Sequence, residues 1–589
     1  MQRSLWILIT LGTIFYIAPE FFISLGIVIF ELFLILEECL YDIIYAFVEP
    51  RAEITSYDYI IVGAGTAGSL IAANLSRYLN CTVLVLEAGP YPSIFHNVPA
   101  LTPLFHGSQY DWQFKTEPQL KSCGIMENNQ CKYPVGKGFG GSSLINNMIW
   151  HRGIDVDYHG WFSNSTEYNY KKEIEPLFFN LELELKPQPL RYVTKLGRLL
   201  ANLSNSMEIN FFQPYVLQKT GKRYTTYTYA KEKSNFNTKF IAKAMVQKLN
   251  FDINNNNLRV SGIEFEKNKK KYKVAARKAV ILSAGTIGSP IILLKSGIGS
   301  CRELKELNIK CLKDLPSVGK NLQDHVATGM SLFQFNESLN MNVISLLKPQ
   351  SIYHFIHPFN SGNGPLTTTG CELLGFSDDK KIGYMFMPVD VTSDNGVKLR
   401  HAMNIRDSVW NNYFKKLSNI QTVSIIPILL HPKSKGWVKL SKINSKYVPS
   451  IDPQYLTEET DFIDLLNGLQ LMRKSILEIQ KANVNLKYIE EKFPGCQNHT
   501  NEDTYWKCYL KQMSFGIYHP IGTCKMGYDS SSVVDYDFKV NNIEGLFIVD
   551  ASIMPNLPSG NPNAAVALLA QKFLNIHTKN FTLDKKSSH

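Results

Sequence analysis

The feature that most limits the fold is the stretch YDYIIVGAGTAGSLIAANL, residues 57–75. Its apolar beginning is typical of a buried parallel strand, and Gly63, Gly65 and Gly68 then follow in the spacing G-x-G-x-x-G and open an Ala-rich helix. The first glycine permits a tight turn, the second lets the backbone approach a pyrophosphate, and the third lets the helix pack on the strand. The stretch therefore predicts an α/β domain whose helix N-terminus receives phosphates.

A carboxylate follows at the expected distance along the chain. A second apolar strand is predicted over residues 82–86, and it ends in Glu87, which is 22 residues after Gly65. In dinucleotide-binding folds an acidic side chain in this position meets a ribose hydroxyl. The order strand, glycines, helix, strand and acid predicts a dinucleotide site, although it leaves the choice between FAD and NAD open.

Composition places the chain among large globular proteins. It has 589 residues, of which 44% are hydrophobic and only 19% charged, so we expect more than one domain or one large composite fold. The net charge is 62 minus 51, or +11, but Lys and Arg are spread along the sequence and no nucleic-acid-reading motif accompanies them. We interpret the excess as a solvated basic surface and expect no nucleic-acid partner.

The N-terminus resembles a targeting segment. Arg3 precedes an uncharged stretch, residues 4–19, which suits the apolar core of a secretory signal better than a membrane span of about 20 apolar residues. Ser24 and Gly26 provide a small-x-small cleavage site, so residues 1–26 are predicted to be a signal peptide. The alternative is an uncleaved signal anchor over residues 1–36.

Secretion is the expectation that follows, with anchoring to a membrane through the N-terminus as the alternative and no other stable membrane insertion. Potential N-glycosylation triplets are consistent with this compartment, and they begin at Asn74, Asn80, Asn164, Asn202, Asn336, Asn498 and Asn580.

Ten cysteines are too few for a disulfide scaffold. Two close pairs, Cys123 with Cys131 and Cys496 with Cys508, lie in polar stretches that contain Gly or Asn and are typical of exposed loops, so we expect both pairs to be bridged. Ordinary buried thiols are the alternative. No histidine pair in the sequence has the further ligands that a metal site needs, and no metal is expected.

Four later segments bear on the identity of the cofactor: VGKGFGGSSLINNMIWHRG (135–153), SAGTIGSPIILLKSGIG (283–299), LPSVGKNLQDH (315–325) and GLFIVDASIMPNLPSGNPNAAVALLAQK (545–572). Together with the opening fingerprint they resemble the glucose-methanol-choline (GMC) family of FAD-dependent oxidoreductases, and within it the insect glucose-dehydrogenase-like branch. The resemblance runs from about Tyr57 to Lys572, which is nearly the whole chain after the N-terminal segment.

The resemblance implies a discontinuous α/β architecture. A Rossmann-like FAD-binding domain is expected from residues 57–330 together with 530–580, and a substrate domain built on an antiparallel sheet is expected from residues 331–529. The residues agree where their pattern is informative, because 437–441 alternates like a strand and 460–480 has apolar residues at helical spacing.

The resemblance also implies which residues contact FAD: Gly63, Gly65, Gly68, Glu87, Gly136, Gly141, Asn146, Val246, Asp550 and Ala551. In some members a histidine immediately before the position of Asn146 is bonded covalently to the flavin, whereas this chain has Ile145 there. We therefore predict dissociable, non-covalent FAD. The chain departs from the family at Phe139, a position that is usually aliphatic, so the glycine-rich loop is expected to pack differently there.

The segment YHPIGTCKMG, residues 518–527, is implied to lie over the flavin, with His519 facing the alcohol and Asn561 as its partner. Alcohol oxidation removes the hydroxyl proton and delivers a hydride to flavin N5, and an imidazole is suited to the proton transfer near neutral pH. Asn561 can hydrogen-bond the same oxygen and steady the developing alkoxide. Cys524 lacks the organised base of a thiol nucleophile and is expected in a packed turn, while Lys525 is expected in a structural charge contact.

The sequence thus predicts an FAD enzyme that oxidises a primary or secondary alcohol, such as a sugar (for example glucose) or a steroid hydroxyl, and passes electrons to a quinone-like acceptor. An oxidase that uses oxygen and makes hydrogen peroxide is one alternative, and a non-catalytic secreted binding protein on the same fold is another. The loops expected to choose the substrate, around residues 331–430, carry no motif with a known chemical meaning.

Overall fold

The structure of the chain is a computed structural model. It describes residues 19–48, 56–79, 81–162, 169–204, 208–254, 257–341, 343–346, 348–356, 363–481 and 484–584.

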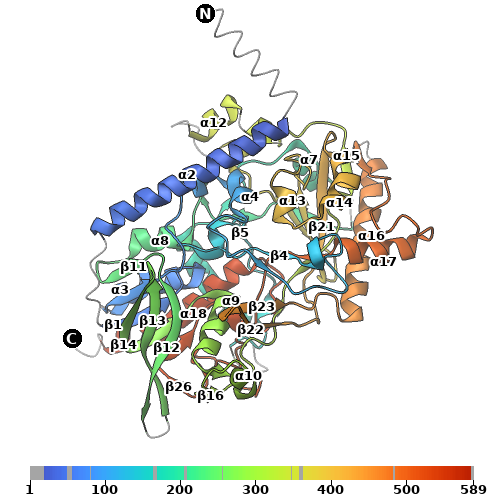
Figure 1. Cartoon of the computed structure of the whole chain (residues 1–589). Helices are drawn as coiled ribbons and strands as arrows, with labels where there is room; N and C mark the ends of the chain where they lie inside the picture. The colour runs from blue at the N-terminus through green and yellow to red at the C-terminus, as the bar shows by residue number, and fades with distance from the viewer. Residues whose placement is uncertain are drawn as a thin grey trace, which may run out of the picture.

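The first of two large sheets has eight strands and carries the glycine fingerprint (Figure 1). Its main strands, from edge to edge, are β11 (Thr238–Ile241), β2 (Val83–Leu86), β1 (Ser56–Val62), β14 (Lys270–Leu282), β13 (Asn257–Lys267) and β12 (Met245–Asn254). The pairs β11·β2, β2·β1 and β1·β14 are parallel, whereas β12, β13 and β14 pair antiparallel. Every side chain of β2 is buried, as expected for a parallel strand covered on both faces.

Two distant parts of the chain complete this sheet. Strands β26 (Ile543–Glu544) and β27 (Leu546–Ile548), from near the C-terminus, pair in parallel with β13 and β14. Helix α3 (Thr66–Leu79), which follows the fingerprint, packs between α8 (Thr226–Lys233) and α18 (Pro562–Asp584). The predicted α/β fold with a C-terminal return is confirmed, because the strand before Asp550 and the helix after it both join this layer.

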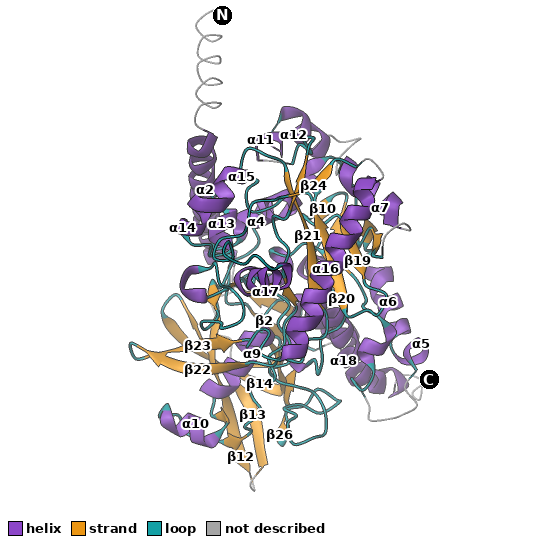
Figure 2. Ribbon diagram, turned by 90° about the vertical axis from the view of Figure 1, so that its right-hand side faces the viewer, coloured by secondary structure: helices purple, strands orange, loops and turns teal. Residues whose placement is uncertain are grey.

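The second large sheet also has eight strands, and all of its pairs are antiparallel. Its order is β24 (Leu486–Tyr488), β18 (Phe333–Phe335), β21 (Thr422–Leu429), β20 (Ile382–Met387), β19 (Leu373–Phe376) and β7 (Asn210–Phe212), with β17 (Val326–Ala327) pairing both β21 and β25 (Phe515–Gly516). Figure 2 shows this sheet beside the first one, with α16 (Glu459–Lys481) lying along it. The antiparallel sheet and the helix expected over 460–480 are confirmed.

The remaining longer elements surround these sheets. They are α6 (Glu175–Leu185), α7 (Lys195–Leu203), α9 (Gly285–Lys295), α12 (Pro349–Ile356), α17 (Glu502–Met513) and the hairpin β22 (Trp437–Ile443) and β23 (Lys446–Asp452). The strand expected over 437–441 is therefore confirmed. Because β7 belongs to the second sheet although its residues precede 330, the exact domain limits at 330 and 529 stay a prediction.

An N-terminal helix, α2 (Pro19–Val48), lies across the molecule above α8 and α4 (Thr102–Phe105) (Figure 1). Leu34 is buried, and the ring of Phe30 contacts Phe95 and Phe105 at centroid distances of 5.2 and 5.6 Å. Residues 1–18 of the predicted signal segment are outside the described residues, whereas its remainder forms the first turns of α2. None of the described helices has the combined length and apolar character needed to cross a membrane.

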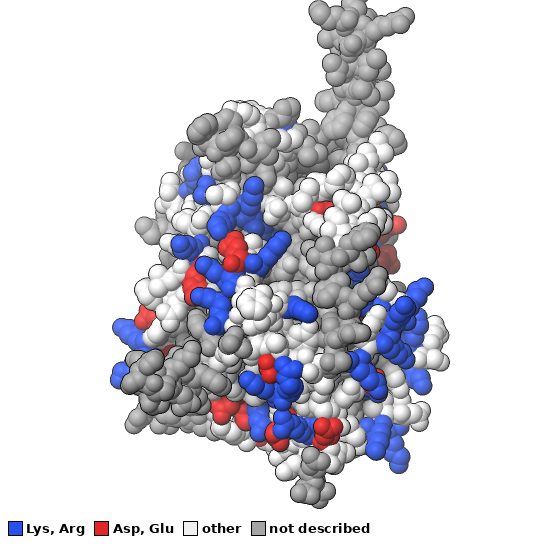
Figure 3. All heavy atoms as spheres, turned by 90° about the vertical axis from the view of Figure 1, so that its left-hand side faces the viewer, with Lys and Arg blue, Asp and Glu red and all other residues white. Residues whose placement is uncertain are grey.

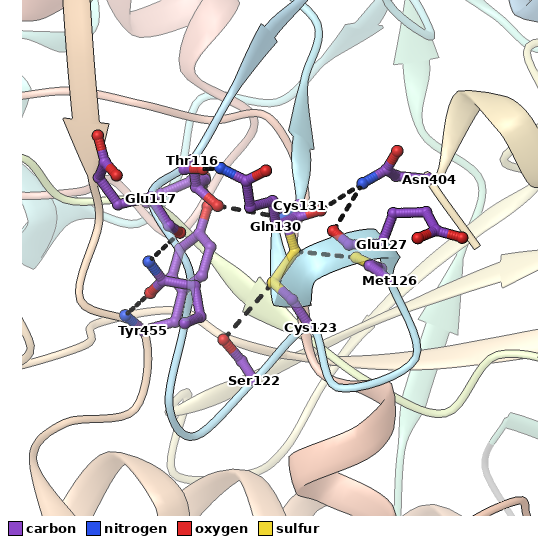
Figure 4. Close-up of a disulfide and its surroundings, with 12 residues drawn as sticks. Thr116, Glu117, Ser122, Cys123, Met126, Glu127, Gln130, Cys131, Asn404 and Tyr455 are labelled. Atoms are coloured by element: carbon purple, nitrogen blue, oxygen red, sulfur yellow. Dashed lines mark hydrogen bonds between the residues drawn. A yellow bond between two sulfur atoms is a disulfide. The ribbon is translucent and has the colours of Figure 1, made fainter. Parts of the chain in front are cut away.

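Three disulfides are present, and two of them are the predicted pairs. Cys123–Cys131, shown with its hydrogen-bonded surroundings in Figure 4, and Cys496–Cys508 have Cα separations of 5.6 and 5.8 Å. The third, Cys301–Cys311, was not predicted; it ties the start of α10 (Cys301–Glu306) to the segment before β16 (Lys313–Asp314). Three bridges are compatible with an extracellular protein.

The surface agrees with the interpretation of the net charge. Figure 3 shows Lys and Arg on one face in several separate groups, with Asp and Glu among them, which is typical of a solvated surface. One potential glycosylation site is removed, because Asn74 is 5% exposed within α3 and its amide donates to the Leu70 carbonyl.

Candidate active site

A cavity of about 1180 Å³ lies between the two sheets. It is lined by most of the residues predicted to bind the cofactor and by both predicted catalytic residues: Gly63, Gly65, Glu87, Gly136, Gly141, Asn146, Val246, Asp550, Ala551, His519 and Asn561. Gly68 is not among the lining residues. A Cβ at Gly68 would lie 2.1 Å from the Gly63 carbonyl oxygen, so this glycine lets α3 approach β1 closely, as the fingerprint requires.

The fingerprint loop and the second glycine-rich loop touch each other. Gly63 has φ +100°, and a Cβ there would lie 2.4 Å from the Ser283 carbonyl oxygen, so only glycine fits the turn. Gly141 has φ +54°, and a Cβ there would lie 2.8 Å from the Cα of Gly65. The two loops therefore form one wall of bare backbone, against which a flat or phosphorylated group can lie closely.

Glu87 stands at the end of β2 and holds this wall together. Its Oε1 accepts from the backbone N–H groups of Gly89 and Gly138 at 2.9 and 3.1 Å, and its Oε2 accepts from Ala64 at 2.9 Å. Burial raises the pKa of Glu87, and these three hydrogen bonds oppose that shift. A carboxylate can accept about four hydrogen bonds, so one more, from a ribose hydroxyl, can be accommodated at the cavity wall.

Asp550 joins two segments of the cavity wall. Its Oδ2 accepts from Gly285 N–H and the Ser289 hydroxyl at 2.9 and 2.6 Å, and its Oδ1 accepts from Ser552 N–H at 2.8 Å. It therefore fixes the N-terminal end of α9 next to Ala551. Burial raises the pKa of Asp550, and its hydrogen bonds oppose the shift.

Asn146 is held by a buried arginine. The Arg223 guanidinium donates to the carbonyl and the side-chain oxygen of Asn146 at 2.8 and 3.1 Å, and also to the Ser143 carbonyl at 2.8 Å. Arg223 is 5% exposed, and burial lowers its pKa to about 9. The sequence did not single out this arginine, whose hydrogen bonds to Ser143 and Asn146 hold the glycine-rich loop in place.

Phe139 and Ile145, the two positions singled out by comparison with the family, both lie in packed apolar surroundings. Phe139 is completely buried and stacks on Tyr91 at 4.6 Å, with Tyr227 and Phe240 close by, so the larger side chain fills an aromatic cluster behind the loop. Ile145 lines the cavity and packs in the apolar cluster under α2. An isoleucine offers no atom that can bond to a flavin.

His519 and Asn561 meet in the cavity. The Asn561 side-chain amide nitrogen lies 3.1 Å from His519 Nε2, although the two residues come from different segments. The Tyr518 backbone immediately before His519 has φ +68°, an uncommon conformation for a residue with a side chain. Such strain is concentrated at functional sites, and here it turns the imidazole toward the amide.

A second histidine, which sequence reasoning missed, supports the first. Nδ1 of His325 lies 2.8 Å from Nδ1 of His519, so one of the two nitrogens donates and the other accepts. Next to it, Asp324 accepts from the His519 backbone N–H at 2.7 Å and from the Tyr455 hydroxyl at 2.5 Å. The segment ending in Gln-Asp-His was recognised as part of the family pattern, but nothing in it indicated a contact with a residue 194 positions away.

These contacts set the protonation states. Burial lowers the pKa of His519 to about 3, and burial together with repulsion from His519 lowers the pKa of His325 well below its usual value. Burial raises the pKa of Asp324 to about 6, although the hydrogen bonds from Tyr455 and His519 oppose the shift. Both imidazoles are therefore neutral near pH 7. With Asn561 donating to Nε2, His519 carries its proton on Nδ1, donates it to His325 and keeps Nε2 as a base.

Asn561 is positioned by hydrogen bonds between Asp157 and Ser559, which are far apart in the sequence. Asp157 accepts from both the backbone N–H and the hydroxyl of Ser559, at 2.7 and 2.8 Å. The Ser559 hydroxyl also lies 3.0 Å from His431 Nε2. This network anchors the Ser-Gly-Asn turn at Ser559, two residues before Asn561.

The other two candidates in the segment have structural contacts. Cys524 is completely buried and its backbone N–H donates to the Ser552 carbonyl at 2.7 Å, as expected for a packed turn. Lys525 forms an ion pair of 2.8 Å with Asp529. Within the described residues no group of three or more His, Cys, Asp or Glu side chains is arranged to hold a metal ion.

Comparisons with known proteins agree with this geometry. The GMC oxidoreductase N-terminal family model matches residues 57–210 and 202–327, and the C-terminal model matches residues 432–570. The chain is a GMC oxidoreductase. It is 27% identical to a glucose dehydrogenase (FAD, quinone) of Drosophila melanogaster over 89% of this chain and 86% of that protein. It is 30% identical to an alcohol dehydrogenase (acceptor) of Pseudomonas putida over 87% of this chain and 94% of that protein.

Solved structures share the fold of this GMC oxidoreductase. A pyridoxine 4-oxidase from Mesorbium loti has a TM-score of 0.70 and 23% identity, covering 88% of this chain and 99% of that one. A formate oxidase variant of Aspergillus oryzae has a TM-score of 0.72 and 19% identity, covering 90% and 99%.

The predicted family, enzyme class and cofactor are confirmed: the protein is an FAD-dependent oxidoreductase. The cavity fits FAD by its own features, because the wall of bare glycine backbone ends at the buried Glu87 carboxylate.

Proposed function

We propose that this GMC oxidoreductase oxidises the CH–OH group of an alcohol, with His519 as the base and Asn561 as the group that steadies the alkoxide. The observation that carries the proposal is the pairing of a neutral imidazole with a side-chain amide, 3.1 Å apart, in the cavity that the glycine loops enter. FAD, when bound, supplies the acceptor for the hydride that leaves the alcohol carbon.

The residues divide the work as follows. The alcohol hydroxyl replaces the Asn561 amide as the donor to Nε2 of His519, so that Nε2 takes the hydroxyl proton while the amide donates instead to the oxygen that becomes negative. His519 then carries a positive charge. Because its Nδ1–H donates to Nδ1 of His325, 2.8 Å away, that charge is stabilised by a hydrogen bond within the protein.

The substrate and the electron acceptor each have two candidates. A sugar such as glucose and a steroid hydroxyl are both candidate substrates, and a quinone-like acceptor is favoured by the similarity to a glucose dehydrogenase named for quinone. Oxygen as the acceptor, giving hydrogen peroxide, is the second candidate, since solved relatives include oxidases. A non-catalytic binding protein is disfavoured because the His519–Asn561 pair is intact.

Three further features belong to the same proposal. FAD is held without a covalent bond, because Ile145 stands where a covalent attachment would need a histidine. The FAD-binding domain comprises residues 57–330 and 530–580 and encloses the substrate domain, 331–529. The protein enters the secretory pathway and is released or held by its N-terminal segment, with which the three disulfides are compatible.

The deciding experiment is anaerobic reduction of the FAD-loaded protein by a panel of alcohols, followed by reoxidation with either oxygen or a soluble quinone. Loss of the oxidised flavin absorbance on mixing with at least one alcohol is expected. A protein that binds FAD but is reduced by none of them would contradict the assignment, and the faster reoxidant identifies the acceptor.

A further inference from the structure

The half of the cavity that faces the second sheet is lined by an unusual set of side chains. Most of them are apolar, and five are methionines, Met330, Met341, Met385, Met387 and Met403. The hydroxyls that also line this half, of Thr368, Thr369, Ser393 and Ser424, each form a hydrogen bond within the protein. Methionine is flexible and polarisable, so a methionine-rich wall adapts to bulky apolar ligands. On its other side the cavity is closed by Ile23, Ile27 and Phe30 of α2.

The buried charged groups in this half are already paired within the protein. Asp390 accepts from the backbone and the hydroxyl of Thr392 at 2.8 and 3.2 Å, and Asp394 accepts from three backbone N–H groups at 2.7 to 2.9 Å. Lys398 donates to Glu31 of α2 at 3.2 Å. Lys348 also lines the cavity, but it is exposed.

We infer that the substrate is an apolar alcohol, a long-chain or polycyclic alcohol with one reacting hydroxyl, and not a sugar. The inference rests on the proposed function, since the reacting hydroxyl is the one held by His519 and Asn561. A hexose would bring several further hydroxyl groups into this wall of methionine and aliphatic side chains, where each would lose its water without gaining a partner. An alkyl chain or ring system gains from the same wall by burying its surface.

The test compares 1-butanol, 1-hexanol, 1-octanol and glucose as reductants of the FAD-loaded full chain without oxygen. Burying one methylene contributes about 0.8 kcal/mol, so the second-order rate constant of reduction should rise about fourfold per methylene, and about 250-fold over the four methylenes from butanol to octanol. Glucose should react more slowly than octanol. A rate constant that does not change with chain length, or a glucose rate that equals the octanol rate, overturns the inference.

The same compounds separate this inference from the proposed function. If none of them reduces the flavin, the catalytic proposal fails, and dissociation constants from the perturbed flavin absorbance still decide the substrate class. Tighter binding of octanol than of glucose then supports an apolar site, and the reverse order overturns it.

A matched pair of variants locates the effect. Met387→Gln keeps the size of the side chain but puts an amide into the wall, and it should lower the octanol rate constant about 3- to 10-fold while butanol changes little. Leu120→Gln, at a residue that is 88% exposed and outside the cavity, is the control and should change neither. Equal loss for octanol and butanol in Met387→Gln would mean a general disturbance and would count against the apolar wall.

A different observation, the outward face of α2, carries a second proposal. Nine large apolar side chains of this face are 43% to 66% exposed: Leu25, Val28, Ile29, Leu32, Ile35, Leu36, Leu40, Ile43 and Ile44. Exposed apolar surface of this extent on one element marks an interaction site.

The carboxylates of α2 form their contacts with the globular body of the protein. Within residues 23–44, Glu31 pairs with Lys398, Glu37 accepts from the Ile94 backbone N–H, and Glu38 and Asp42 both pair with Lys243. The acidic groups thus fasten α2 to the globular body and leave the opposite face apolar. In addition, the chain before the helix, residues 4–18, has no charged side chain.

We propose that α2 lies on a lipid bilayer, with its outward face in the interfacial layer and its inward face closing the substrate cavity. An interfacial helix does not need to cross the membrane, and its apolar side is buried about 5–10 Å into the boundary between headgroups and acyl chains. In this position α2 alone separates part of the cavity from the phase in which an apolar alcohol dissolves.

Cys39 provides the probe, because it is exposed on α2 while the other free cysteines, Cys81, Cys371 and Cys524, are buried. The full chain labelled at Cys39 with an environment-sensitive fluorophore should show a blue-shifted emission on phosphatidylcholine vesicles and quenching by nitroxide-labelled lipid. Vesicle binding without quenching would mean that only the N-terminal segment attaches. A blue shift without vesicles, together with a dimer in sedimentation, would mean that a second copy covers the face. Either result overturns the proposal.

Variants check the same face. The double change Leu36→Glu and Leu40→Glu should abolish quenching of the Cys39 label and weaken vesicle binding at least tenfold. Leu120→Glu, away from α2 and 88% exposed, is the control and should leave both unchanged. Retained quenching in the double variant would contradict the proposal.

Discussion

Replacing His325 should slow flavin reduction without weakening substrate binding. The imidazole of His325 is 1% exposed, and its Nδ1 lies 2.8 Å from Nδ1 of His519. When His519 takes the alcohol proton, this contact becomes a hydrogen bond donated by a charged group. Such bonds contribute about 1.5–3 kcal/mol, so His325→Leu should lower the rate of reduction about 10- to 150-fold.

The assay is anaerobic stopped-flow reduction at saturating alcohol, with the alcohol dissociation constant taken from the concentration dependence. The constant should stay within about twofold, because His325 does not line the cavity. His325→Asn is the matched variant, since its side-chain oxygen can accept near the position of Nδ1 and should restore part of the rate. The reasoning is refuted if His325→Leu reduces at the wild-type rate, or if Asn and Leu are equally slow while both variants remain folded and loaded with FAD.

Three other predictions concern the cofactor and the second catalytic residue. Glu87→Ala should weaken FAD retention, because three backbone N–H groups and a ribose hydroxyl lose their acceptor. Gel filtration with detection of flavin absorbance measures the retained FAD. Full retention would mean that Glu87 is only a residue at the end of a strand. Mild acid denaturation should release free FAD, since Ile145 offers no attachment, whereas flavin recovered on a peptide would contradict this. Asn561→Ala should slow reduction about 10²- to 10³-fold, as for other donors to a developing oxyanion, and should leave the pH profile unchanged; a shifted profile would show that the amide acts through the His519 pKa instead.

Much of the fold could be predicted because its signals are local. The strand, the glycines and the acid of the fingerprint lie within about thirty residues. The structure shows why glycine is needed, since a Cβ at Gly68 would lie only 2.1 Å from the Gly63 carbonyl oxygen. The return of β27 and α18 to the first sheet is not local. It was predicted from the family resemblance, since no periodicity in residues 545–572 indicates which sheet they join.

The site was predictable only in part, for a related reason. His519 and Asn561 stand in recognisable motifs, but the partners that orient them come from far along the chain. His325 and Asp324 were part of a recognised segment without a visible role, and Asp157, which holds the turn before Asn561, lies 402 residues from Ser559. Contacts of this kind leave no spacing rule in one sequence.

The Cys301–Cys311 disulfide and the packing of α2 were not predicted, because the local composition did not indicate either of them. The Cys301–Cys311 pair has a separation of 10, similar to the other bridges, but it lies in a charged, leucine-containing stretch that does not resemble an exposed loop. Helix α2 begins with a long apolar run, residues 21–30, so its sequence was interpreted only as a targeting segment. The packing of Leu34 and the pairs formed by its acidic residues are visible only in the structure.

The central claim, that His519 is the base, is tested most directly by the pH dependence of flavin reduction in the wild type and in His519→Ala. Burial lowers the pKa of His519 to about 3, so the imidazole is neutral and competent above that pH, and protonation of His519 itself stops reduction as the pH falls toward 3. The account predicts a wild-type rate that is level from pH 7 to 8, because Asp324, which accepts from the His519 backbone N–H, has a pKa raised to about 6 by burial and changes charge below that range. In His519→Ala, FAD should stay bound, and reduction should be about 10²- to 10⁴-fold slower, the usual contribution of general acid–base catalysis. A variant that keeps the wild-type rate with every alcohol that the enzyme accepts would contradict the account and leave His519 as a packing residue.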